Sequence, residues 1–197
     1  MKIRKKIGIF GGLFDPPHIG HLILGQWVLE EFNLNRIIFI PAFKPPHKDI
    51  YSPFKHRYKM IEISIRDNKR FFLSDIERYI RGKTYTYKVL QFLKKSNPLY
   101  SESDLYLIIG ADQWNEIEHW KKPDTIFRYA QVVVLPRPNY NIKDNSPFYK
   151  KIMLSNAPLI DISSTMVRER IKAGLSIDYL VIPEVQDYIK REKLYIT

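Results

Sequence analysis

Short runs of apolar, mostly β-branched residues alternate along the chain with longer segments in which apolar residues recur every three or four positions. The first pattern is typical of buried strands, and the second is typical of helices with one buried face. Strands are expected over residues 7–10, 36–40, 71–73, 105–109, 131–135 and 152–154. Helices are expected over residues 17–32, 52–66, 85–95, 124–129, 164–173 and 183–192.

Proline, glycine and serine support several of these boundaries. Ser52 and Pro53 suit the capping position and the first position of a helix. Pro41 and Pro136 end the second and fifth strands, and Gly174 ends the penultimate helix. The boundaries therefore have local chemical causes besides the hydrophobic pattern.

The order of the elements predicts the fold class. Strands that alternate with helices indicate a parallel sheet covered on both faces, so we expect an α/β protein with a Rossmann-like, doubly wound sheet. The 197 residues, 45% of them hydrophobic, suit a single domain over residues 1–197 with a sizeable core. Residues 96–103 and 137–148 are the most loop-like segments, and neither resembles a linker between domains.

Composition narrows the chemistry. The chain has no cysteine, which excludes disulfides, cysteine–zinc sites and a thiol nucleophile. It has no run of 18 apolar residues that would indicate a transmembrane helix. The apolar stretch at residues 7–10, after the basic start, is too short for a signal peptide. We expect a cytoplasmic protein.

The net charge of +11 has two interpretations. One is a surface for nucleic acid or an anionic membrane, and the other is a set of solvated lysines on a phosphate-handling enzyme. The basic residues are spread along the chain without a block of five or six. This spread favours the second interpretation, and we expect neither a nucleic-acid nor a membrane partner.

The segment 8–21 joins the first strand to the first helix and carries the first group of candidate site residues. In open α/β sheets, ligands bind at the carboxyl ends of strands, where helix N-termini attract anions. Gly11 and Gly12 would let a phosphate or sugar approach the backbone closely. The glycine spacing differs from the Gly-X-Gly-X-X-Gly fingerprint of dinucleotide-binding folds.

His18 and His21 are three residues apart and share one helix face, and Gly20 between them leaves room for a flat group such as adenine. Two imidazoles beside phosphates can donate hydrogen bonds to oxygens that gain charge in a transition state. A tight turn followed by surface histidines is the alternative. A zinc site is another, although no cysteine or clear third ligand completes it.

The segment 161–170 opens a late helix and carries the second group. Serine caps, free backbone N–H groups and an arginine together form an anion site. The residues concerned are Ser163, Ser164, Thr165 and Arg168, with Arg168 expected on the first turn. A capped surface helix is the alternative. With segment 8–21, this segment would form a two-sided clamp for a triphosphate.

Two motifs carry a resemblance to a known superfamily. Residues 11–21 read Gly-Gly-Leu-Phe-Asp-Pro-Pro-His-Ile-Gly-His, and residues 162–168 read Ile-Ser-Ser-Thr-Met-Val-Arg. The pair resembles the nucleotidyltransferases with a His-X-Gly-His signature, and within them the family of bacterial nicotinate-nucleotide adenylyltransferases. Further similar segments lie at residues 45–48, 84–86, 108–112, 120 and 137–138, so the resemblance covers residues 7 to about 190.

The resemblance implies transfer of AMP from ATP to nicotinic acid mononucleotide in NAD biosynthesis, with Mg²⁺ held mainly by the ATP phosphates. It implies catalytic roles for His18, His21 and Arg168. It implies ATP contacts from Gly11, Gly12, Phe14, His18, Gly20, His21, Gly110, Asp112, Ser163, Ser164, Thr165 and Arg168. It implies mononucleotide contacts from Lys44, His47, Thr84, Tyr85, Thr86, Trp120 and Arg137. Asp15, Asp112 and Asp161 are candidates for outer partners of the metal.

One position departs from the family pattern. The family usually has threonine or serine where this chain has Leu13. A hydroxyl contact is lost there, while backbone N–H contacts remain, so we expect an adjusted site. Trp120 would stack on the pyridine ring, and a place in the core is its alternative. A homo-oligomer is compatible with the sequence.

Rival functions share part of this signature. Related adenylyltransferases use nicotinamide mononucleotide or phosphopantetheine as acceptor. A fragment of a class I aminoacyl-tRNA synthetase would carry His-X-Gly-His, but its Lys-Met-Ser-Lys-Ser partner is missing. A non-catalytic, basic nucleic-acid-binding protein is the alternative from another class.

Overall fold

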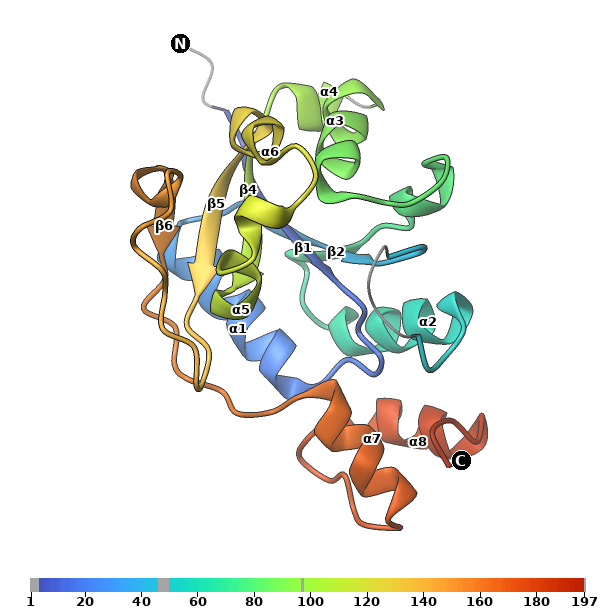
Figure 1. The fold of residues 1–197 in the computed structure, drawn as a ribbon. Coiled ribbons are helices and arrows are strands. Elements are labelled where there is room, and N and C mark those ends of the chain that lie inside the picture. Colours follow the sequence, from blue (N-terminus) through green and yellow to red (C-terminus); the bar gives the residue numbers. More distant parts are fainter. Residues whose placement is uncertain (1–3, 46–49, 97, 197) are drawn as a thin grey trace.

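A computed structural model describes residues 4–45, 50–96 and 98–196, which build one six-stranded parallel sheet with helices on both faces (Figure 1). The strands are β1 (Lys6–Gly12), β2 (Arg36–Pro41), β3 (Phe71–Leu73), β4 (Asp104–Gly110), β5 (Ala130–Leu135) and β6 (Ile152–Leu154). Their order in the sheet is β3-β2-β1-β4-β5-β6, and every pairing is parallel. The predicted doubly wound α/β fold is confirmed.

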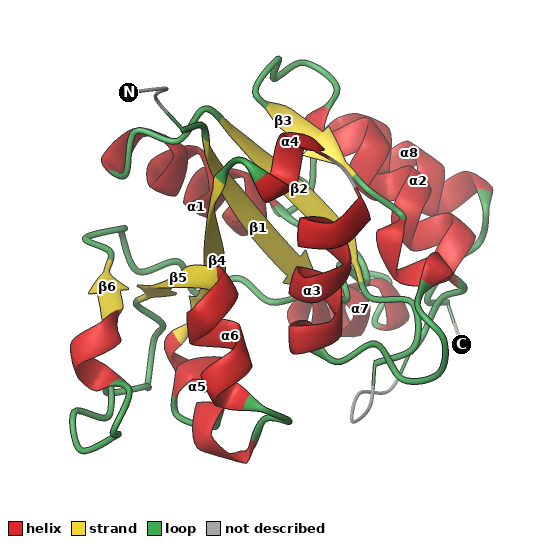
Figure 2. Cartoon of the chain, turned by 90° about the horizontal axis from the view of Figure 1, so that it is seen from above, coloured by secondary structure: helices red, strands yellow, loops and turns green. Residues whose placement is uncertain are grey.

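Helices cover both faces of this sheet (Figure 2). They are α1 (Ile19–Glu31), α2 (Phe54–Ile65), α3 (Thr86–Ser96), α4 (Pro98–Ser101), α5 (Ala111–Trp114), α6 (Pro123–Tyr129), α7 (Ser164–Lys172) and α8 (Pro183–Arg191), with 3₁₀ turns η1 (Ile76–Tyr79), η2 (Ile117–His119) and η3 (Tyr149–Lys151). Helices α1 and α2 pack on one face, and α3, α5 and α6 pack on the other. No helix in the described part of the chain is long and apolar enough to cross a membrane.

The sheet divides the interior into two apolar clusters because successive strand residues point to opposite faces. Leu107 and Val132 pack toward α3 and α6, whereas Ile108 and Val133 pack toward α1 and α2. All four side chains are buried. Burial on both faces explains why the strands appear in the sequence as continuous apolar runs.

A third cluster holds α7 and α8 against the outer side of α2. Its buried members are Met60, Val167, Ile177, Val181, Val185, Tyr188, Ile189 and Tyr195. In Figure 1, α7 and α8 lie together below the sheet, beyond its carboxyl edge. This third cluster therefore places the N-terminus of α7 beside the loop that follows β1.

Two local predictions were wrong. Residues 96–103, expected as loop, contain the one-turn helix α4, which is too short to show a helical period. Ser52 does not cap α2: the helix begins at Phe54, and the Ser52 hydroxyl donates instead to the carboxylate of Asp15. A buried carboxylate is the more demanding partner, because an unpaired buried charge costs more than a helix-terminal N–H left in water.

Candidate active site

The topology opens a crevice at the carboxyl ends of β1 and β4. The chain runs from β1 outward to β2 and β3, then returns to place β4 on the other side of β1. At such a switch point the loops diverge and leave room for a ligand. Gly12 ends β1 and Gly110 ends β4. A Cβ on Gly110 would meet Oδ1 of Asp112, so a larger residue here would displace the Asp112 side chain.

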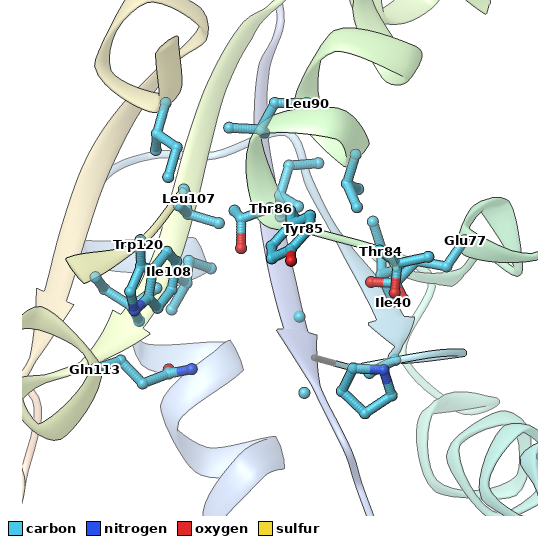
Figure 3. A pocket seen from close by; sticks show the side chains of 18 of the residues that line it. Ile40, Glu77, Thr84, Tyr85, Thr86, Leu90, Leu107, Ile108, Gln113 and Trp120 are labelled. Carbon is cyan, nitrogen blue, oxygen red and sulfur yellow. The ribbon is translucent and has the colours of Figure 1, made fainter. Parts of the chain in front are cut away.

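A cavity of about 710 Å³ opens at this edge of the sheet. This volume suits a small-molecule site. Trp120 and Gln113 lie on one side of the cavity, and Thr84 and Glu77 lie on the other, as Figure 3 shows. Tyr85 lies between these two sides (Figure 3). The Trp120 side chain therefore lies across the cavity from the polar residues Thr84 and Glu77.

His18 and His21 form a close pair at the N-terminus of α1. Their ring centroids are 3.7 Å apart, and Nδ1 of His21 accepts a hydrogen bond of 3.1 Å from the backbone N–H of His18. The proton of neutral His21 therefore lies on Nε2. Nδ1 of His18 is buried without a hydrogen-bond partner. Both rings thus retain a nitrogen for a ligand.

Both histidines are neutral at pH 7. Burial lowers the pKa of His18 to about 4, and the nearby Arg137 guanidinium acts in the same direction. Burial, followed by His18 and Arg137, also lowers the pKa of His21 well below its ordinary value. The pair can therefore donate hydrogen bonds, while the positive charge beside it comes from arginine.

Acid should destabilise the folded chain through His18. Its pKa is about 4 in the folded chain against 6.5 ordinarily, so the unfolded chain binds the proton more tightly. The stabilisation is fully present above pH 6.5 and is lost as the pH falls toward 4, by about 3 kcal/mol. Urea unfolding at pH 7 and pH 4 measures this loss. His18→Gln should lose correspondingly less stability, and equal losses in both proteins would contradict the assignment.

Helix α7 meets the loop between β1 and α1 through its N-terminal serines. Ser163 caps the helix as predicted, because its Oγ accepts the N–H of Met166 at 3.1 Å. The Ser164 hydroxyl donates to the carbonyl of Pro16 at 2.8 Å. The two predicted segments, 8–21 and 161–170, are therefore neighbours in space.

Arg168 makes the second connection between these segments. Its Nη1 donates to the carbonyl of Asp15 at 2.7 Å, and its Nη2 donates to Oγ1 of Thr165 at 3.0 Å. The guanidinium lies 3.9 Å from the ring centroid of Tyr51. Because α7 begins at Ser164, Arg168 lies on the second turn and not on the first. It is also largely buried, so a ligand would meet a guanidinium that the protein already holds in place.

Comparison with known proteins places this site in a family. Residues 9–170 match the cytidylyltransferase-like family model. The chain is 36% identical to nicotinate-nucleotide adenylyltransferase of Bacillus subtilis and 38% identical to a probable nicotinate-nucleotide adenylyltransferase of Bacillus pumilus. Each match spans 193 residues, 97% of this chain and 98% of the relative. The chain belongs to the nicotinate-nucleotide adenylyltransferase family. It is thus a nucleotidyltransferase, as the resemblance implied.

Solved structures support the same fold. The Plasmodium falciparum nicotinic acid mononucleotide adenylyltransferase complexed with NaAD superposes with a TM-score of 0.80, at 24% identity, over 98% of both chains. The structure of a putative nicotinate-nucleotide adenylyltransferase from Vibrio parahaemolyticus gives a TM-score of 0.70 at 22% identity. The nucleotidyltransferase architecture therefore extends over nearly the whole chain.

The predicted site residues of this family member fall into two sets. Those that line the cavity are Gly11, Gly12, Thr84, Tyr85, Thr86, Asp112 and Trp120. Those outside its lining are Phe14, His18, Gly20, His21, Lys44, Gly110, Arg137, Ser163, Ser164, Thr165 and Arg168. His47 lies outside the described residues. The cavity lining thus combines predicted mononucleotide contacts with predicted ATP contacts, and which ligand each residue binds stays a prediction.

Phe14 was predicted to contact ATP. Its side chain is buried in the core and cannot reach a nucleotide. Its ring lies 4.9 Å from the ring of His21 and 5.9 Å from that of Phe39. Phe14 therefore supports His21 from the core side. The neighbouring Leu13 lines the cavity, at the position where the family usually has a hydroxyl-bearing residue.

Arg137, a predicted mononucleotide contact, lies beside Asp112, a predicted ATP contact. Nη1 of Arg137 is 3.6 Å from Oδ2 of Asp112, while Oδ1 of Asp112 is buried without a hydrogen-bond partner. That free oxygen suits a sugar hydroxyl. Lys44 is exposed, with its Nζ over the ring of Phe43, and its carbonyl accepts the N–H of Thr84 at 3.2 Å.

Glu77 lines the cavity although the sequence did not suggest it. Its Oε2 accepts the N–H of Phe43 at 2.8 Å. Burial raises the pKa of the Glu77 carboxyl, and hydrogen bonds from Thr84 and Phe43 oppose this effect. A glutamate in a short turn looks like a surface residue, so the sequence held no signal for it.

The prediction that Asp15 is an outer partner of the metal does not fit the structure. Its side chain is fully buried, and both carboxylate oxygens accept hydrogen bonds from the protein. Within the described residues, no three histidine, aspartate or glutamate side chains gather in a way that could hold a metal ion.

Proposed function

We propose that this chain transfers AMP from ATP to nicotinic acid mononucleotide, which yields nicotinic acid adenine dinucleotide and pyrophosphate in NAD biosynthesis. Full-length similarity to named members of the family supports this substrate pair. The observation that carries it is the cavity between Trp120 and Thr84, which is also lined by Gly11, Gly12 and Leu13 at the start of the loop that leads to the N-terminus of α1.

ATP would bind along the loop that joins β1 and α1. His18 and His21 would donate hydrogen bonds to the phosphates, and the N-terminus of α7 with Arg168 would hold them from the other side. A Cβ on Gly20 would lie 2.9 Å from Cγ2 of Ile160, so Gly20 lets α1 pack closely against that segment, and its contact with the adenine stays a prediction from the sequence. The buried Oδ1 of Asp112 would accept a ribose hydroxyl.

The mononucleotide would bind in the cavity itself. Trp120 presents an aromatic ring to a planar pyridine, and stacked rings are stabilised beyond their buried area. Thr84 supplies a hydroxyl on the opposite wall, and Thr86 supplies one between the two sides (Figure 3). Arg137 is placed to contact a phosphate near the histidines, because it is close enough to lower the pKa of both.

The reaction then needs positioning and charge stabilisation rather than a general base. A phosphate oxygen of the mononucleotide attacks the α-phosphorus of ATP, a new P–O bond forms, and the bond to the pyrophosphate oxygen breaks. A phosphate monoester is already an anionic nucleophile at pH 7. Neutral His18 and His21 would donate to oxygens that gain charge, and Arg168 would balance that charge.

A magnesium ion on the triphosphate would supply further charge neutralisation, held chiefly by phosphate oxygens and water. Outer contacts to this ion from Asp112 and Asp161 stay predictions from the sequence. A cytoplasmic location, a homo-oligomer and the lack of nucleic-acid and membrane partners stay predictions from the sequence.

Acceptor choice tests the proposal directly. Pyrophosphate release is measured with ATP and Mg²⁺, and nicotinic acid mononucleotide, nicotinamide mononucleotide and phosphopantetheine are offered separately. We expect the first to be preferred by at least tenfold in kcat/KM. Preference for another acceptor would reassign the substrate within the superfamily, and no turnover with any of the three would refute the proposal.

A further inference from the structure

The carboxylate of Asp15 accepts hydrogen bonds from residues that are distant in the sequence. Its Oδ2 accepts the backbone N–H groups of Tyr51 at 2.8 Å and of Ser52 at 3.1 Å. Its Oδ1 accepts the Ser52 hydroxyl and, at 2.6 Å, the hydroxyl of Tyr195. Since the side chain of Asp15 is fully buried, these protein donors take the place of water around the charge.

The same stretch of loop is fixed through its backbone carbonyls. Arg168 donates to the carbonyl of Asp15 at 2.7 Å. Arg57, which is fully buried, donates to the carbonyl of Leu13 at 2.9 Å and to that of Ser52 at 3.1 Å. The loop that leads to His18 is therefore held at both Leu13 and Asp15.

Tyr195, which donates to the Asp15 carboxylate, lies in the segment after α8. Its ring packs in the third cluster, and the N–H of Leu194 donates to the carbonyl of Ile189 at 3.0 Å, which turns the segment back on the helix. Lys193 and Tyr195 have φ values of 52° and 64°, which are uncommon for residues other than glycine. Burial, followed by the charge of Asp15, raises the pKa of the Tyr195 hydroxyl, which therefore remains a donor.

We propose that Tyr195 is a positioning residue for the phosphate-binding loop and acts through its hydrogen bond to Asp15. This proposal rests on the adenylyl transfer proposed above. The argument is geometric: Asp15 is three residues before His18, and its carbonyl orients the guanidinium of Arg168. A shift of Asp15 would displace both groups that face the reacting phosphates. Trp120 and Thr84, on the two sides of the cavity, belong to other segments, and Tyr195 does not line the cavity, so we expect the mononucleotide contacts to change little.

A matched pair of tyrosine variants tests this role. Tyr188 is buried in the same third cluster, but its hydroxyl is 2.9 Å from Nδ1 of His56 and does not reach the loop. Tyr195→Phe and Tyr188→Phe each remove one buried hydroxyl. We expect Tyr195→Phe to lower kcat about fivefold with the mononucleotide KM within twofold of wild type. We expect Tyr188→Phe to leave both constants within twofold, although it also lowers the thermal midpoint.

The wild-type turnover, measured first, keeps this test separate from that of the proposed function. Equal kcat values for the two variants would overturn the proposal, because Tyr195 would then contribute to folding alone. A parallel rise in the mononucleotide KM would also overturn it. If Tyr195→Phe does not fold, Ser52→Ala removes the other hydroxyl on the same carboxylate oxygen and should show the same selective fall in kcat. An unchanged kcat in that variant would count against the loop mechanism.

Discussion

Replacing His18 by alanine is expected to reduce kcat about 10²-fold or more. His18 occupies the N-terminus of α1 with one ring nitrogen buried and unpaired, and it is neutral at pH 7. Losing a preorganised donor to developing charge has an effect of this order on turnover. Steady-state pyrophosphate release under saturating ATP and mononucleotide measures it.

His56→Ala is the matched control for that variant. His56 is half-buried on α2, where its Nδ1 pairs with the hydroxyl of Tyr188, and it does not line the cavity. Its loss should leave kcat within twofold of wild type. A turnover of His18→Ala within threefold of wild type would remove His18 from the catalytic role.

Arg168→Ala is expected to raise the ATP KM at least tenfold and to lower kcat as well. The guanidinium connects α7 to the loop through the carbonyl of Asp15, and it would also balance phosphate charge. Its removal takes away a cation and leaves a buried carbonyl without its donor, which costs about 1–3 kcal/mol of stability. Initial rates over a range of ATP concentrations, with a thermal melt of each variant, separate the two effects.

Two further variants sharpen the test of Arg168. Arg170 lies on the same helix but donates to the carbonyl of Ser176, so Arg170→Ala should keep a wild-type ATP KM. Arg168→Lys keeps the charge but not the planar fork of donors, and should fall between wild type and alanine. An ATP KM that does not change in Arg168→Ala would refute the clamp.

Most of the sheet was predictable because its strands are buried on both faces. The runs Phe71–Leu73 and Ile152–Leu154 were expected at the bounds that the structure shows, and the other strands are longer than expected by one to three residues. The turn of helix at Pro98–Ser101 was missed, since four residues carry no period.

Local chemistry at the site was also predictable, whereas its long-range contacts were not. The cap on α7 by Ser163 and the His18–His21 pair follow from spacings of three residues. The connection of Asp15 to Tyr195, and the place of Glu77 in the cavity wall, depend on packing between segments far apart in the sequence. A pattern along one sequence does not show which distant segments pack together in the fold.

The hydrogen bonds around Asp15 also have a consequence for the order of folding. They join positions separated by 37, 153 and 180 residues. Closing longer stretches of chain costs more conformational entropy, so such contacts tend to form later than local ones. We therefore expect the loop to take its final shape late, once α7, α8 and the segment of Tyr195 have packed in the third cluster. The fold would then form before the phosphate-binding loop is complete.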